Sequence, residues 1–207
     1  VREEEAVNYE FGFRRRSDSR RLEVIGFLSD YDNLLGECTA SSGANCEVGD
    51  AFNGNAVTVR GVEIIAGTDL AGSNIPLEVA YTYIDGSFDT DIADTAFFGD
   101  VSTGDSIPYI PKHQLHAMIG FVQPQWAVHL SANFVDETCV RAACGAFEIT
   151  DSSFTVDIAV HWSINEAVGL FARVENLADS SDIVGLHPYG ARPNKSRTAL
   201  VGLDLSF

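Results

Sequence analysis

The chain has 207 residues, of which 45% are hydrophobic and 21% are charged, so it could form one large β domain or two small ones. This composition excludes a disordered chain, and no stretch approaches the roughly 18 consecutive apolar residues of a transmembrane helix. The formal net charge of −17 argues against nucleic acid as a partner, since phosphate binding needs clustered Lys and Arg.

Alternation of apolar and polar residues is the dominant pattern, and it predicts β-strands. Apolar residues occupy every second position in the segments 7–13, 62–66, 77–83, 115–121, 126–134, 154–162, 168–174 and 201–207. A less regular segment at 20–31 completes about nine predicted strands of roughly ten residues each. No helix is expected.

The connections between these strands alternate strictly between short and long. The short ones contain "RSDS", "DLAGSN", "QPQ" and "INE", and the long ones cover roughly 32–55, 85–112, 136–152 and 179–195. All short turns therefore lie at one end of the predicted sheet and all long loops at the other. Outer-membrane β-barrels sort their connections in this way, and strands of about 9–11 tilted residues cross a bilayer.

Polar residues lie on the strand face opposite the apolar one, where they would line a hydrated lumen. They are Glu10, Arg14, Glu63, Glu78, His129, Asn133, Asp157, Arg173, Glu175 and Asp204. A soluble antiparallel sheet with one wet face is the alternative. The sorting of the loops favours the membrane barrel.

The C-terminal segment "RVENLADSSDIVGLHPYGARPNKSRTALVGLDLSF" resembles the end of TonB-dependent outer-membrane receptors, most closely the ferric-citrate-receptor-like branch. The matching features are Asn176 with Leu177, the "PYGARP" loop at 188–193, Arg197 with Thr198, and the final Phe207. The upstream stretches "AVNYEFGFR", "YDNLLGECTASSGANCEVGDAFNGNAVTVRGVE" and "YTYIDGSF" are similar to successive strands and loops of the same branch.

The resemblance implies an all-β fold, an antiparallel transmembrane β-barrel of 22 strands preceded by a plug. Residues 1–207 would be the C-terminal portion of the barrel, about nine strands, with the plug and its energy-coupling motif absent from this chain. Two open sheet edges in hydrocarbon would leave unsatisfied backbone groups, so the chain is expected to need the rest of its receptor.

The resemblance also implies the function, which is uptake of a ferric chelate of the citrate or carboxylate siderophore type. The receptor would sit in the lipid of the bacterial outer membrane with its long loops extracellular, and TonB would act through the missing plug. Phe207 continues the apolar row of Val201, Leu203 and Leu205, and it resembles the signal that the barrel assembly machinery reads.

The alternative function is a passive porin-like or adhesive outer-membrane barrel without energy coupling. The chain opens without an initiator Met or a signal peptide, so either processing removed its front or it is a piece of a longer protein. The sequence before Val1 would discriminate between the two functions, because a plug with a coupling motif favours the transporter.

No catalytic residues are assigned and no enzyme is expected, because G-x-S-x-G, H-E-x-x-H and phosphate-binding glycine motifs are absent. An outer-membrane protease or lipase is the enzymatic alternative.

Four cysteines form two close pairs, Cys38 with Cys46 and Cys139 with Cys144, each inside a long loop. Neither pair is C-x-x-C, and no His lies close by in sequence, so two loop disulfides are predicted rather than a metal clip.

No metal site is predicted. His113 and His116 form an H-x-x-H, but on a strand residues three apart point to opposite faces. The loop at 85–100 carries Asp85, Asp89, Asp91, Asp94 and Asp100, which could hold calcium as the one cofactor considered. The loop lacks EF-hand spacing, so a solvated acidic loop is favoured.

Capture of an anionic chelate requires positive charge in the loops, because Arg pairs carboxylates through two hydrogen bonds. Arg141 lies between Cys139 and Cys144, and Arg192 and Lys195 lie in the last long loop. His187, Tyr189 and Arg192 of the last loop, with Arg141, are the predicted substrate-binding residues. The alternative for each cation is an ion pair with a neighbouring carboxylate.

Overall fold

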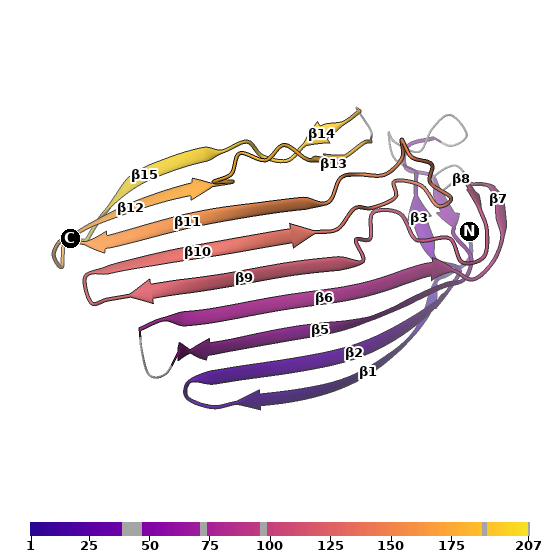
Figure 1. The fold of residues 1–207 in the computed structure, drawn as a ribbon. Helices are drawn as coiled ribbons and strands as arrows, with labels where there is room; N and C mark the ends of the chain where they lie inside the picture. The colour runs from indigo at the N-terminus through magenta and orange to yellow at the C-terminus, as the bar shows by residue number, and fades with distance from the viewer. Residues whose placement is uncertain (39–46, 71–73, 96–98, 188–189, 207) are drawn as a thin grey trace.

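The computed structural model describes residues 1–38, 47–70, 74–95, 99–187 and 190–206. Nine long strands form one antiparallel sheet in which each strand pairs with its neighbours in chain order (Figure 1). They are β1 (Glu5–Arg16), β2 (Arg20–Asp32), β5 (Val57–Asp69), β6 (Pro76–Phe88), β9 (His113–Val122), β10 (Trp126–Val135), β11 (Ser153–Ser163), β12 (Val168–Glu175) and β15 (Thr198–Leu205). The nine predicted strands are confirmed, and the irregular segment at 20–31 is β2.

The sorting of the connections is also confirmed. Figure 1 shows the short turns at one end of the curved sheet and the long loops, with their small hairpins, at the other. Among the described residues, no helix is long and apolar enough to span a membrane.

Three small hairpins in the long loops were not predicted. They are β3 (Leu35–Glu37) with β4 (Ala51–Asn53), β7 (Ile92–Thr95) with β8 (Gly99–Val101), and β13 (Ile183–Gly185) with β14 (Arg192–Pro193). Strands of two to four residues are too short to show a two-residue period, so the sequence pattern could not reveal them.

One face of the sheet is apolar along its whole width. The cross-strand register joins Phe13, Val24, Ile64, Tyr81, Leu115, Phe134 and Phe154 in a single row. Phe11 on the same face is 85% exposed, as expected for side chains that meet lipid rather than a protein core. We call this the apolar face.

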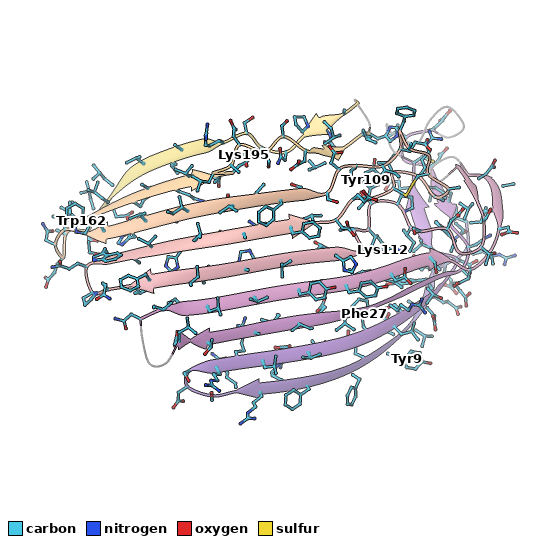
Figure 2. All side chains as sticks on the ribbon, viewed as in Figure 1. Tyr9, Phe27, Tyr109, Lys112, Trp162 and Lys195 are labelled. Carbon is cyan, nitrogen blue, oxygen red and sulfur yellow. A yellow bond between two sulfur atoms is a disulfide. The ribbon has the colours of Figure 1, made fainter. Side chains whose placement is uncertain are left out.

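Aromatic side chains mark both ends of the apolar face. At the loop end, the His113 ring centroid lies 6.2 Å from that of Tyr81 and 5.3 Å from that of Tyr83. At the turn end, the Phe121 and Trp126 ring centroids are 5.1 Å apart, and Trp162 lies opposite Trp126. Figure 2 shows Trp162 at this end of the sheet. Along β9, His113 and Phe121 are separated by about 27 Å, similar to the apolar band of a transmembrane barrel, which is about 25 Å tall. The spacing fits two membrane interfaces.

The opposite face, the polar face, carries ion pairs between neighbouring strands. Arg14 on β1 pairs with Glu23 on β2, and Arg173 Nη2 on β12 lies 4.0 Å from Asp157 Oδ2 on β11. Within β12, Arg173 Nη2 lies 3.1 Å from Glu175 Oε1, and His161 Nε2 on β11 lies 3.5 Å from Asp204 Oδ2 on β15. His116 lies on this face, where its Nδ1 is 2.7 Å from Asn133 Oδ1, while His113 contacts Tyr81 on the apolar face. The prediction that His113 and His116 point to opposite faces is confirmed.

Two aromatic rings on the polar face cover glycines on the facing strand. Phe27 lies opposite Gly61, and Phe171 lies opposite Gly202. A Cβ at Gly61 would lie 2.6 Å from the Phe27 ring, and one at Gly202 would lie 2.3 Å from the Phe171 ring. The rings therefore occupy the space that a side chain would need, which explains why these positions are glycine.

Candidate functional site

The long loops are joined to one another by a small buried core at the loop end of the sheet. Val57, Phe88, Val101 and Ala142 are each at most 4% exposed and form one cluster. They belong to β5, β6, β8 and the β10–β11 loop, with Tyr31, Phe52 and Ile107 packed around them. Burial of these side chains stabilises a fixed arrangement of the loops, which is a precondition for a binding site.

Backbone hydrogen bonds extend this arrangement to the last loop. The Tyr109 N–H donates to the Cys139 carbonyl at 2.9 Å, which ties the β6–β9 loop to the β10–β11 loop. The Asp151 N–H donates to the Ile183 carbonyl at 2.8 Å, and the Ile183 N–H donates to Asp151 Oδ2 at 2.7 Å. Three loops far apart in the sequence therefore meet.

Tyr109 stands where these loops meet. Its φ of 61° is a left-handed conformation that a tyrosine adopts at a cost of about 1–3 kcal/mol. Burial raises the pKa of its phenol, while the positive charge of Arg192 and a hydrogen bond from the His187 backbone act in the opposite direction. The phenol thus lies close to two residues of the last loop and stays protonated at neutral pH. The side chain is 41% exposed. Figure 2 shows Tyr109 at the loop end of the sheet.

Arg192 begins β14, and its guanidinium folds back over its own hairpin. Its Nη2 donates to the His187 carbonyl at 3.1 Å, and it lies 2.9 Å from the position that a Cβ on Gly185 would occupy. Gly185 therefore makes room for the guanidinium. Arg192 forms no ion pair with a carboxylate that the structure describes, so its charge is available to an anion.

The other loop cations have partners. Arg141 Nε lies 3.5 Å from Glu148 Oε1 within the β10–β11 loop, and Lys195 pairs with Glu175. Arg197 Nη2 lies 3.5 Å from Asp179 Oδ2. Of the four predicted substrate-binding residues, the structure brings His187 and Arg192 together and places Arg141 in an ion pair. Tyr189 lies outside the described residues, as does Phe207, so the proposed assembly signal stays a prediction.

One of the two predicted disulfides is seen directly. Cys139 and Cys144 are joined, with their Cα atoms 5.6 Å apart. Cys38 is buried and is also in a disulfide, while its predicted partner Cys46 lies outside the described residues. The Cys139–Cys144 ring includes Arg141 and the core residue Ala142, so it holds the part of the loop that packs against Phe88 and Val101.

We expect the intact mass of the chain without reductant to be lower than its reduced mass by the four hydrogens of two disulfides. The physical reason is that each pair is separated by only a few residues in sequence, so its two thiols stay within reach of each other. Mass spectrometry before and after reduction measures the difference. Complete alkylation of the native, non-reduced chain would contradict the prediction.

The carboxylates of the acidic loop accept hydrogen bonds from protein groups. Asp85 Oδ2 lies 2.9 Å from Arg60 Nη2, and Asp89 Oδ2 accepts from the Thr58 hydroxyl at 2.7 Å. Hydrogen bonds from the Thr103 N–H and hydroxyl lower the pKa of Asp91. Among the described residues, no three potential ligands gather to hold a metal ion, and residues 96–98 of this loop lie outside them. The solvated acidic loop, favoured over a calcium site, stays a prediction.

A comparison with protein families decides the identity of the fold. The model of the TonB-dependent receptor-like β-barrel matches residues 2–177. The chain belongs to this family. The resemblance noted in the sequence is therefore confirmed at the level of the family, and β-barrels of TonB-dependent receptors reside in the bacterial outer membrane.

Solved structures of TonB-dependent receptors share the fold. The ferric yersiniabactin uptake receptor FyuA from Yersinia pestis is 17% identical, with a TM-score of 0.76 over 99% of this chain and 30% of its own. The ferric citrate transporter FecA in its unliganded form is 19% identical, with a TM-score of 0.73 over 98% of this chain and 31% of its own. The copper transporter OprC is 18% identical, with a TM-score of 0.74 over 99% of this chain and 31% of its own. Among curated proteins, no sequence matches.

The chain therefore spans about 30% of the length of the solved receptors it resembles. Within this part of a TonB-dependent receptor, sequence reasoning missed Tyr109. It lies in the middle of a long loop with no periodic pattern, and its only local signal is the pair of prolines, Pro108 and Pro111, on either side. Its importance comes from contacts with residues about eighty positions away, which no local pattern reports.

Proposed function

We propose that this chain is the C-terminal portion of the barrel of a receptor that imports an anionic ferric chelate, of the citrate or carboxylate siderophore type. The observation that carries the substrate class is Arg192, a loop guanidinium without a carboxylate partner among the described residues, next to the protonated phenol of Tyr109. Membership of the TonB-dependent receptor family supports the transport class.

The chemistry of the two groups favours a carboxylate ligand. A guanidinium binds a carboxylate through two parallel N–H···O bonds, and a protonated phenol adds a further donor. One of the Arg192 donors is used by the His187 carbonyl, and the remaining N–H groups can bind an anion. His187 serves this site through its backbone, which holds both Arg192 and Tyr109. Arg141 would contribute only if a ligand displaced Glu148.

The proposal also covers the orientation of the barrel in the membrane and the parts of the receptor that would complete it. The long loops face the outside, where the chelate arrives, and the short turns face the periplasm. The remaining strands and the plug come from the rest of the receptor, and TonB supplies energy through the plug. The sorting of short turns and long loops to opposite ends of the sheet, and the aromatic side chains at both ends of the apolar face, support this arrangement.

Uptake of radiolabelled ferric citrate by intact cells tests the proposal. We expect deletion of the gene, in a strain without a redundant receptor, to abolish uptake, and an uncoupler of the inner membrane to abolish it in the wild type. A passive porin-like barrel would leave uptake insensitive to the uncoupler. Ferric citrate uptake that persists after deletion of the gene would refute the proposed substrate class.

A further inference from the structure

The first turn of the chain is strongly basic, although the chain as a whole is acidic. The segment "RRRSDSRR" at 14–21 holds five of the 13 Lys and Arg residues of the chain. It connects β1 to β2 at the end of the sheet opposite the loop site, so the proposed chelate binding does not involve it.

The strand register divides these arginines between the two faces of the sheet. Arg15 lies opposite Leu22, and Arg20 lies opposite Thr68 and two residues from Leu22, so both are on the apolar face. Arg16 lies opposite Arg21 on the polar face. Each of Arg14 and Arg21 has a glutamate partner, whereas Arg15, Arg16 and Arg20 form no ion pair with a described residue.

The arginines of the apolar face line a hollow at the border of the apolar band. This hollow has a volume of about 480 Å³, and its walls are Arg15, Ser17, Ser19, Arg20 and Leu22. The two guanidinium groups and the Ser19 hydroxyl are hydrogen-bond donors suited to phosphate oxygens, while the Ser17 hydroxyl donates to the Arg20 carbonyl at 3.5 Å. We call it the arginine hollow.

A second, apolar depression begins where the arginine hollow ends. It has a volume of about 430 Å³ and shares Arg20 and Leu22 with the hollow, and Leu77 and Val79 form its far wall. The cross-strand register joins Leu22, Ala66 and Val79 in one row, and the depression forms because Ala66 has the smallest side chain of the three. A donor-rich hollow followed by an apolar groove on a lipid-facing surface matches the two parts of a phospholipid.

We propose that the arginine hollow binds the phosphate of an anionic glycerophospholipid, with one acyl chain in the groove over Ala66. The charge of the hollow complements the phosphate, and its position places the headgroup at the membrane interface and the chain in the hydrocarbon region. The inference concerns the turn end of the barrel and does not depend on the substrate of the receptor.

Native mass spectrometry of the purified, delipidated full-length receptor tests the proposal, with phosphatidylglycerol as the probe. Arg15→Gln and Arg20→Gln should each raise the dissociation constant about fivefold, as expected for one basic side chain at an anionic lipid. Ala66→Leu fills the groove without changing charge and should also weaken binding. Arg16→Gln, in the same turn but on the polar face, should leave binding unchanged.

Three results would overturn the inference. Equal binding of phosphatidylcholine would show that the charge of the arginines is not used. Competition by millimolar inorganic phosphate would indicate a site for free phosphate rather than for a lipid. An equal loss in Arg16→Gln would show that the turn attracts lipid by its net charge and not through the arginine hollow. Chelate uptake is measured separately, so failure of either proposal is distinguishable from failure of the other.

Discussion

Replacing Arg192 by glutamate should raise the dissociation constant of the receptor for an anionic ferric chelate by about 10- to 150-fold. A hydrogen bond to a charged group contributes about 1.5–3 kcal/mol, and the substitution both removes the donors and adds repulsion. The expected loss is large because Arg192 has no competing carboxylate among the described residues, unlike Arg141 and Lys195. Calorimetric titration of the purified full-length receptor with ferric citrate measures the change.

Two further variants separate the binding role of Arg192 from its support of the hairpin. Arg192→Lys keeps the positive charge but lacks the planar guanidinium that binds a carboxylate through two hydrogen bonds. Its affinity for the chelate should lie between those of the wild type and Arg192→Glu. Arg2→Glu reverses a charge at the same end of the sheet, beside Asn53 and outside the loop site, and should leave affinity within about twofold, since salt screens exposed charges. Unchanged affinity in Arg192→Glu would refute the loop site.

Replacing Gly61 by alanine should lower the free energy of unfolding of the barrel by about 1–3 kcal/mol, the usual cost of overpacking. The added Cβ would lie 2.3 Å from the Tyr83 carbonyl oxygen and 2.6 Å from the Phe27 ring. The ring can move, but the carbonyl belongs to the backbone of β6, so the sheet itself must shift. The folded fraction of the full-length receptor, followed by heat-modifiable gel mobility against urea concentration, measures the loss.

Gly67→Ala is the matched control, because Gly67 lies on the same strand and the same face as Gly61. Its nearest contact would be the Leu77 carbonyl oxygen at 3.6 Å, an ordinary van der Waals distance. We expect its unfolding midpoint to stay close to that of the wild type. Phe27→Leu should rescue Gly61→Ala only in part, since the contact with Tyr83 remains. Equal midpoints for the two alanine variants would show that the sheet absorbs the clash at no cost.

The sequence by itself determined the strands, the two ends of the sheet and one observed disulfide. A strand with one face in lipid has an apolar residue at every second position. Eight of the nine long strands show this alternation clearly in the sequence, and β2 shows it less regularly. Turn residues between those periods separated short from long connections. Cys139 and Cys144 are only 5 residues apart, so their pairing required no knowledge of the fold.

Only the tertiary structure decided which residues meet. Tyr109 and Arg192 are more than eighty residues apart in sequence, yet the charge of Arg192 acts on the Tyr109 phenol. The loop that carries Tyr109 is held at Ile107, which packs against the buried cluster of Val57, Phe88, Val101 and Ala142. The fit of Phe27 over Gly61 and the position of Arg15 on the apolar face depend on register, and a slip of one residue would reverse both. The alternation of apolar and polar residues within a strand reflects whether each face meets lipid or water, so it can be read from that strand alone. Register and loop packing depend on contacts between residues far apart in sequence, which no short stretch of sequence contains.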